Sequence, residues 1–232
     1  MDVLLIPGLW LDASSWDDVI PVLRSAGHTP HPLSMPGVGS PGDESREVGM
    51  GDWIDAAVAR LDALTGPVAV VGHSGGGNVA YGAVDARPDK VARVILVDTF
   101  PQGDGGIIWD EFPEVDGVIP FPGWDAFEQN EIQDLDDDAR ARIEQVVKTV
   151  PRKVPADPLV LTDVRRREVP MTMITCSVPS GVVREYMAQG PPWIAELAAI
   201  EDLDLVDLPA GHWPQFSRPT ELGEAIVRSL TD

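Results

Sequence analysis

Short runs of mostly apolar residues recur along the chain, separated by segments with helical patterns. The apolar positions within each run are continuous rather than alternating, which is typical of strands covered on both faces, as in a parallel sheet. Right-handed crossovers would wind such a β-α-β-α order into a three-layer α/β fold with about six mainly parallel strands. The four stronger predicted strands are residues 2–6, 67–71, 91–97 and 171–176, and the two weaker ones are residues 28–33 and 203–208.

Two segments carry apolar stripes at the spacing of a helix that packs one face against a core. Gly66 follows the first stripe and Pro219 precedes the second, which suits the residues that end and begin helices. The first stripe consists of Met50, Ile54, Ala57, Val58, Leu61 and Leu64, and the second of Leu222, Ile226, Val227 and Leu230.

Residues 100–168 interrupt this order and are rich in Pro, Gly and acidic residues. A helical stripe from Leu135 to Val150 begins beside three aspartates, residues 136–138, where carboxylates suit the helix dipole and need no metal to explain them. We therefore expect an α/β core of residues 1–99 and 169–232 and a small helical cap insertion of residues 100–168. The cap is expected to roof the site, and its deletion to change substrate preference more than stability.

The bulk composition excludes several classes of protein. A chain of 232 residues with a net charge of -21 reads as one acidic domain, and neither nucleic acid nor an acidic membrane surface is an expected partner. Its single cysteine, Cys176, allows no internal disulfide and fits a reducing compartment. The start MDVLLIPGLWL lacks the basic residue of a signal peptide, and no apolar run approaches the ~20 residues of a membrane span, so we expect a cytoplasmic protein.

The stretch PVAVVGHSGGGNVAYGAV, residues 67–84, places Ser74 between a predicted strand and a predicted helix. A strand that ends in G-x-S-x-G and leads into a helix is a nucleophile elbow, which exposes the serine hydroxyl on a strained turn. The free N–H groups at the helix start suit an oxyanion. A phosphate-binding loop is disfavoured because no lysine follows the glycines.

A nucleophilic serine requires a base, and the chain has four histidines. His73 is next to Ser74 in the sequence, and the side chains of consecutive residues point apart. We therefore expect His73 to pack beneath the turn rather than to act as the base. His28 and His31 lie far upstream. His212 follows the last predicted strand, at the sheet edge that also carries Ser74, and is the expected base.

Three segments together resemble the α/β-hydrolase superfamily: IPGLWLDASSW after the first strand, GHSGG after a later strand, and GHWPQFSRP near the end. The resemblance covers nearly the whole chain except the insertion. The short chain and the segment ADPLVLTDVRRREVPMTMITC are most similar to small bacterial esterases related to the plant methylesterase and hydroxynitrile-lyase branch. The superfamily's pattern implies an oxyanion hole formed by the backbone N–H groups of Leu9 and Gly75.

Two departures from the superfamily's pattern affect the site. Pro7-Gly8 stands where many members have His-Gly, which leaves the main-chain N–H of Leu9 available. The usual position of the triad acid, residues 176–180, contains no carboxylate. Asp98 ends the strand after the nucleophile strand and resembles the acid of haloalkane dehalogenases in its position, so we expect Asp98 to serve, with Asp163, Glu185 or no acid as alternatives.

Other residues are less specific. Trp10 and Trp213 are the best candidates for a substrate pocket because each lies near a predicted catalytic position, although core packing explains either one equally well. Arg165, Arg166 and Arg167 are expected to form a solvated turn, and Cys176 to be a buried strand residue rather than a nucleophile.

The combined prediction is a serine hydrolase without cofactor or metal that cleaves a small carboxylic ester or lactone through an acyl-enzyme. Ser74 would attack, His212 would transfer the proton and Asp98 would orient the histidine. A small-molecule substrate is the expected partner, and a homodimer stays open. The alternatives are a lyase or a cofactor-free peroxidase on the same fold, or a hydrolase-like receptor with little turnover.

Overall fold

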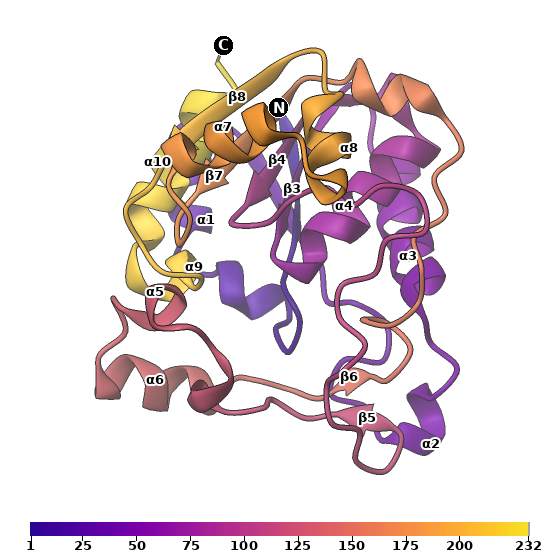
Figure 1. The fold of residues 1–232 in the computed structure, drawn as a ribbon, viewed down its shortest axis with the longest axis vertical. Coiled ribbons are helices and arrows are strands. Elements are labelled where there is room, and N and C mark those ends of the chain that lie inside the picture. Colours follow the sequence, from indigo (N-terminus) through magenta and orange to yellow (C-terminus); the bar gives the residue numbers. More distant parts are fainter. Residues whose placement is uncertain (232) are drawn as a thin grey trace.

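The computed structural model describes residues 1–231, and at its centre is a six-stranded sheet in the order β2-β1-β3-β4-β7-β8 (Figure 1). Every neighbouring pair of strands in this sheet is parallel. The six predicted strands are confirmed, two of them with the predicted ends and the others with ends that differ by at most two residues. The strands are β1 (Asp2–Ile6), β2 (Thr29–Pro32), β3 (Val68–His73), β4 (Val91–Val97), β7 (Met171–Thr175) and β8 (Leu203–Asp207).

Helices connect these strands, and both predicted apolar stripes lie on helices, α3 and α10. Helix α3 ends at Ala63 and Leu64 is already extended, and Gly66 follows with a φ of 86°, a conformation that glycine adopts without strain. The helices are α1 (Ile20–Ser25), α2 (Gly42–Ser45), α3 (Met50–Ala63), α4 (Gly75–Ala86), α5 (Gln129–Ile132), α6 (Asp137–Glu144), α7 (Ser180–Gln189), α8 (Ala195–Ala198), α9 (Pro214–Ser217) and α10 (Pro219–Ser229).

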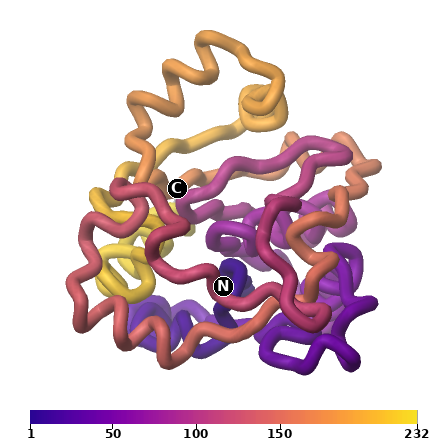
Figure 2. Tube along the Cα trace, turned by 60° about the horizontal axis from the view of Figure 1, so that its bottom comes forward, coloured from indigo at the N-terminus to yellow at the C-terminus, as the bar shows by residue number. Residues whose placement is uncertain are grey.

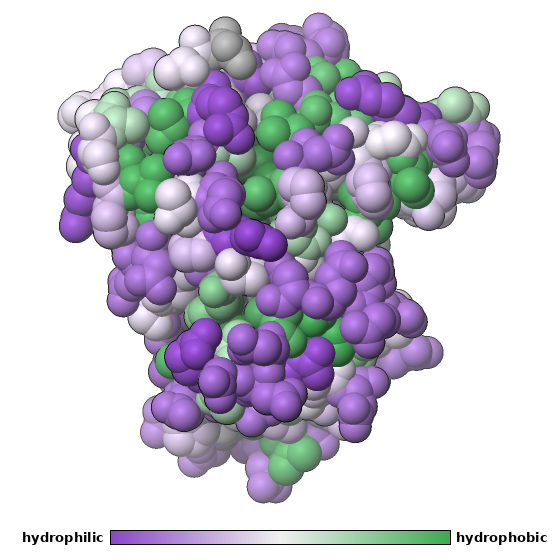
Figure 3. Space-filling model, turned by 90° about the vertical axis from the view of Figure 1, so that its left-hand side faces the viewer, coloured by the Kyte–Doolittle hydropathy of each residue, from purple (hydrophilic) through white to green (hydrophobic). Residues whose placement is uncertain are grey.

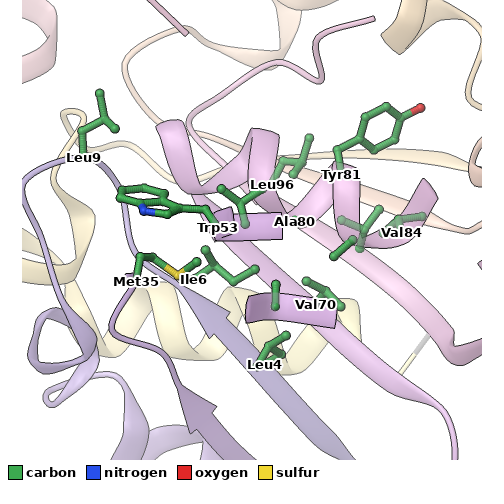
Figure 4. Packing of buried hydrophobic residues seen from close by; sticks show 14 of the residues in the cluster. Leu4, Ile6, Leu9, Met35, Trp53, Val70, Ala80, Tyr81, Val84 and Leu96 are labelled. Carbon is green, nitrogen blue, oxygen red and sulfur yellow. The ribbon is translucent and has the colours of Figure 1, made fainter. Parts of the chain in front are cut away.

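Each face of the sheet has its own hydrophobic cluster, because successive residues of a strand point to opposite sides. Leu4 and Val70 belong to the cluster that α3 and α4 cover, whereas Leu5 and Val71 belong to the cluster that α1 and α10 cover. Figure 4 shows Leu4, Val70 and the indole of Trp53 from α3 among the buried residues of the first cluster. The predicted three-layer α/β fold is therefore confirmed.

The middle of the insertion lies at the end of the molecule opposite to both chain termini (Figure 1). It contains α5, α6 and an antiparallel hairpin of two short strands, β5 (Val118–Ile119) and β6 (Val150–Pro151). Several of its apolar residues, among them Ile119 and Ile143, are buried in the same cluster as the α3 side of the sheet. The insertion therefore shares the core of the molecule, and its deletion would also remove buried apolar contacts that stabilise the fold.

The helical stripe expected from Leu135 to Val150 is wrong over its second half. Helix α6 ends at Glu144, and Val150 lies in β6. Distant backbone partners replace the helical hydrogen bonds here: the N–H of Lys148 donates to the carbonyl of Trp10 at 2.8 Å, and the carbonyl of Thr149 accepts from Gly39 at 2.9 Å. Tertiary hydrogen bonds thus override the local pattern.

The expected solvated arginine turn is correct for Arg165 but wrong for Arg166. Arg166 is 4% exposed. Its guanidinium lies 3.2 Å from Asp85 of α4 and 2.9 Å from Glu196 of α8, both of which are also buried. Arg167 adds a second ion pair to Glu196 at 2.7 Å. This buried ionic cluster ties the end of the insertion to the helix that follows Ser74.

The segment that contains α7 and α8 projects from the body of the molecule (Figure 2). Its half-exposed Trp193 packs edge-on against Phe100 and Tyr186. Figure 3 shows one face of the molecule on which hydrophilic residues dominate and apolar residues form small separate patches. Among residues 1–231, none of the helices combines the length and the apolar character needed to cross a bilayer.

Candidate active site

Ser74 lies between β3 and α4 in a strained backbone conformation. Its φ of 50° and ψ of -128° fall in a region that residues with side chains rarely adopt, and such strain is concentrated at functional sites. The chain passes so close to the first loop here that a Cβ at Gly76 would collide with the carbonyl oxygen of Pro7. The glycine therefore allows the sharp turn that presents the Ser74 hydroxyl.

The side chains of Ser74, His212 and Asp98 form a continuous hydrogen-bonded relay. Nε2 of His212 lies 2.8 Å from Oγ of Ser74, and Nδ1 of His212 lies 2.7 Å from Oδ2 of Asp98. The side chain of Asp98 is 4% exposed and that of His212 14% exposed, so solvent reaches the relay mainly from the serine end. The carboxyl ends of β3, β4 and β8 bring together three residues that are far apart in the sequence.

Residues 176 and 177 lie at the superfamily's usual acid position and supply hydrogen bonds that hold Asp98 in place. Oδ1 of Asp98 accepts hydrogen bonds from the backbone N–H groups of Cys176 at 3.0 Å and Ser177 at 2.9 Å, and Oδ2 accepts one from the Ser177 hydroxyl at 2.7 Å. Burial alone would raise the pKa of Asp98, but the hydrogen bonds from His212, Ser177 and Cys176 outweigh it and hold that pKa below its usual value. Asp98 is therefore ionised at neutral pH.

The other two candidate acids lie elsewhere. Asp163 accepts a hydrogen bond from the backbone of Arg165 and forms an ion pair with its side chain. Glu185 is exposed on α7. Of the three carboxylates considered, the structure places Asp98 against His212.

The main chain of His212 is held at both of its polar groups. Its N–H donates to the carbonyl of Glu131 in α5 at 2.7 Å, and its carbonyl accepts from Nε2 of His73 at 2.7 Å. His73 is 1% exposed and lies beneath the turn, as expected. Burial, with a smaller contribution from nearby His212, lowers the pKa of His73 to about 3, so its ring is neutral and its Nε2–H can donate.

The backbone N–H groups of Leu9 and Gly75 are the predicted oxyanion hole. The side chain of Leu9 lies against Gly75, whose Cβ, if present, would be 2.9 Å from Cγ of Leu9. Neither Leu9 nor Gly75 donates its N–H to another residue within the described range 1–231. Gly75 is also the first residue of α4, where the helix dipole favours negative charge.

The relay opens onto a cavity of about 230 Å³ with mainly aromatic walls. Trp10 and Trp213, the two predicted pocket residues, both line it. Trp10 also packs edge-on against Phe112 at 5.1 Å between ring centroids. The remaining lining residues are Leu9, His73, Ser74, Ile108, Trp109, Phe112, Phe127, Glu131 and His212.

The described residues contain no group of three or more His, Cys, Asp or Glu side chains arranged to hold a metal ion. Cys176 is buried, and its burial and the neighbouring Asp98 raise the pKa of its thiol, which is therefore protonated at neutral pH. The polar groups of the cavity can perform proton transfer, nucleophilic attack and oxyanion binding.

Sequence comparison with protein families agrees with this geometry. The model of the alpha/beta hydrolase family matches residues 3–225. This chain belongs to that family. The resemblance inferred from the sequence motifs is thereby confirmed, and membership supports a hydrolase activity.

The relatives of this hydrolase-family chain include bacterial and plant proteins. A lipase of Mycobacterium tuberculosis, LipV, is 30% identical over an alignment of 235 positions that covers 89% of this chain and 86% of the lipase. The crystal structure of a methylesterase from Arabidopsis has a TM-score of 0.76 at 16% identity, with coverage of 100% and 99% of the two chains. A pyrethroid hydrolase from Sphingobium faniae has a TM-score of 0.72 at 22% identity, with coverage of 98% and 96%.

Several residues of this alpha/beta hydrolase site were missed by the sequence analysis. Ser177 could have been found, because it follows β7, which neighbours β4 in the sheet, and therefore lies at the same edge as Asp98. Phe112 and Phe127 belong to irregular parts of the insertion and Glu131 to the short helix α5, and no periodic signal in the sequence places them at the cavity.

Proposed function

We propose that this protein is a serine hydrolase that cleaves small carboxylic esters or lactones through an acyl-enzyme and needs no cofactor. The observation that carries the proposal is the hydrogen-bonded relay of Ser74, His212 and Asp98, which ends at a small aromatic cavity. Neither Lys nor Arg is among the residues that line this cavity, so an anionic substrate suits it poorly.

In the first half of the reaction, Oγ of Ser74 attacks the ester carbonyl carbon while Nε2 of His212 accepts the hydroxyl proton. The N–H groups of Leu9 and Gly75 bind the oxyanion of the tetrahedral intermediate. When the intermediate collapses, the bond to the alcohol oxygen breaks and His212 donates its proton to that oxygen. The acyl group is then bound to Ser74.

In the second half, His212 removes a proton from water, which attacks the acyl carbonyl carbon. The oxyanion again lies between the amides of Leu9 and Gly75. Its collapse breaks the bond to Oγ of Ser74, and His212 returns the proton to that oxygen. The carboxylic acid product leaves, and the enzyme is restored.

Asp98 supports both halves by accepting a hydrogen bond from Nδ1–H of His212. This contact holds the tautomer in which Nε2 can accept a proton, and the negative charge stabilises the imidazolium that forms. The donors from residues 176 and 177 keep the carboxylate ionised and fix its orientation.

The printed names of the relatives agree with ester hydrolysis: one is a lipase and another a methylesterase. The same fold also supports other chemistry, since a tomato methylketone synthase has a TM-score of 0.76 at 13% identity. A substrate screen is therefore needed to separate hydrolase from lyase activity.

The decisive experiment is a turnover screen on short aliphatic esters, aromatic esters, lactones and cyanohydrins with wild type and Ser74→Ala. We expect the variant to lose about 10⁵-fold to 10⁶-fold in ester turnover, as for the nucleophile of other serine hydrolases. Ser25→Ala, which changes an exposed serine in α1, is the matched control and should retain full activity. Equal rates in wild type and Ser74→Ala would remove Ser74 from the mechanism, and tight binding without turnover would favour a receptor.

A further inference from the structure

A second cavity adjoins the candidate active site. It has a volume of about 240 Å³, close to the 230 Å³ of the catalytic cavity. Trp109 and Phe112 line both cavities. These two side chains therefore form a wall that has the catalytic cavity on one side and the second cavity on the other.

The two cavities differ in chemical character. The catalytic cavity is lined mainly by aromatic rings, whereas the second cavity is lined by charged side chains as well as by Ile119, Pro155 and Ala156. These charged residues are Asp110, Glu114, Arg152, Lys153 and Asp157. The wall thus separates the apolar space next to Ser74 from a second space whose surface is also mostly apolar, with charged side chains among its lining residues.

The two aromatic residues of the wall are held to different degrees. Phe112 is half-buried and packs edge-on against Trp10 with ring centroids 5.1 Å apart. Trp109 is 50% exposed, and its ring contacts Phe112 in a tilted arrangement at 6.4 Å. The backbone N–H of Trp109 is anchored to the carbonyl of Pro155 at 2.9 Å. Half of the Trp109 side chain is already exposed, so its truncation loses less buried area than truncation of a core tryptophan such as Trp53.

We infer that Trp109 and Phe112 determine substrate specificity by limiting the length of the ester that fits beside Ser74. The inference rests on the proposed serine hydrolase function and deepens it. With the wall in place, the enzyme accepts short acyl or alkyl groups. Without the wall, the two cavities join into one of about twice the volume, and a longer chain can extend from Ser74 into the second cavity.

The inference is tested with p-nitrophenyl acetate and p-nitrophenyl octanoate as paired probes. The measured quantity is the ratio of kcat/KM for octanoate to that for acetate in wild type, Trp109→Ala and Phe112→Leu. Because fitting or excluding even one methylene changes rates by about 10-fold to 200-fold, we expect this ratio to rise at least about tenfold in Trp109→Ala. Phe112→Leu should raise it by a smaller factor, since leucine still fills part of the wall.

Trp193→Ala is the matched control, because Trp193 is 49% exposed and lines neither cavity. Its octanoate-to-acetate ratio should equal that of wild type. Circular dichroism and thermal melting establish that each variant is folded, and Phe112→Leu tests the wall independently of Trp109→Ala.

Two outcomes would overturn the inference about the wall. One is an unchanged ratio in both wall variants while acetate hydrolysis still depends on Ser74, which would leave the proposed function intact. The other is an equal rise in Trp193→Ala, which would show that loss of any exposed tryptophan has this effect. In contrast, acetate hydrolysis that persists at the wild-type rate in Ser74→Ala would contradict the proposed function itself.

Discussion

The α/β core and the insertion contribute to the site in different ways. In the core, the parallel strands end at one edge of the sheet, and His212 is hydrogen-bonded to both Ser74 and Asp98 there. In the insertion, irregular segments supply the aromatic rings of Trp109, Phe112 and Phe127 that shape the cavity. The regular region therefore positions the hydrogen-bonded relay, and the irregular region, together with Trp10 and Trp213 of the core, lines the cavity.

Among the hydrogen bonds that cross this division, one reaches the proposed base. The carbonyl of Glu131, in the insertion, accepts from the N–H of His212, in the core. The position of the proposed base is thus partly controlled by the region that shapes the cavity. The following changes test how complete the division is.

Asp98→Asn should have the largest effect among changes in the core that spare the nucleophile. Asparagine fits the same space but favours the wrong tautomer of His212, so kcat should fall by at least about 10²-fold, a cautious part of the loss known for serine triads. The fall should be equal for short and aromatic esters, because Asp98 contacts His212 and does not line the cavity. Steady-state kinetics on an ester panel measures both.

Asp163→Asn and Glu185→Gln are the matched controls for this change. Both should keep wild-type kcat, since neither carboxylate contacts His212 in the described structure. If turnover collapsed in either control while Asp98→Asn kept near-normal turnover, the carboxylate changed in that control would be the triad acid. Near-normal turnover in all three variants would imply a Ser-His dyad. A changed ester preference in Asp98→Asn would break the division between core and insertion.

His73→Met should have the next largest effect. Methionine fills the space but leaves the carbonyl of His212 without a donor, so the catalytic ring can shift and kcat should fall by about 10-fold to 100-fold with little change in KM. His73→Gln keeps a donor at a similar reach and should lose less. Equal kcat values for His73→Met and wild type would show that this contact does not position His212.

The pH dependence of stability provides a second readout for His73. Its folded-state pKa of about 3 lies below the value of 6.5 for a free histidine, so the unfolded chain binds an extra proton between these pH values. This contribution to stability is full above pH 6.5 and is lost as the pH falls toward 3. Urea unfolding measures the free energy of unfolding at pH 7.5 and 4.5. Between these pH values wild type should lose up to about 2.5 kcal/mol more of this free energy than His73→Gln.

Ser177→Ala should have the smallest effect of these core changes. It removes the hydroxyl donor to Oδ2 of Asp98 but leaves both backbone donors to Oδ1, so we expect kcat to fall by about tenfold. Ser180→Ala is the matched control at the start of α7, because the Ser180 hydroxyl bonds to Asp207 instead. Ser177→Thr should restore activity, and equal kcat in Ser177→Ala and wild type would contradict a role for the hydroxyl.

The predictability of the fold from sequence follows the same division. Strands such as β3 and β4 are buried on both faces, so their continuous apolar runs identify them directly. Ser74 and Asp98 could be placed because each directly follows such a strand, and parallel strands end at one edge. The helix expected across residues 135–150 failed after Glu144 because backbone hydrogen bonds to Trp10 and Gly39 decide the structure there.

Long-range contacts explain the other misses. The sequence contains three consecutive arginines, and nothing in their spacing distinguishes Arg166, which pairs with Asp85 and Glu196, from its exposed neighbour Arg165. Phe112 and Phe127 reach the cavity through loops whose course depends on the packing of the whole molecule. Local patterns carry no information about such partners.

The buried ionic cluster around Arg166 defines where the insertion could be exchanged for that of a relative. Thr162 and Asp163 also donate backbone hydrogen bonds to Asp85, so the chain is bound to α4 before the strand β7 begins. A graft with its splice point before Thr162 retains every charge of this cluster. A graft that continues to residue 168 and lacks the arginine leaves buried carboxylates without a counter-charge, which costs about 3–5 kcal/mol and should appear as a lower melting temperature of that chimera.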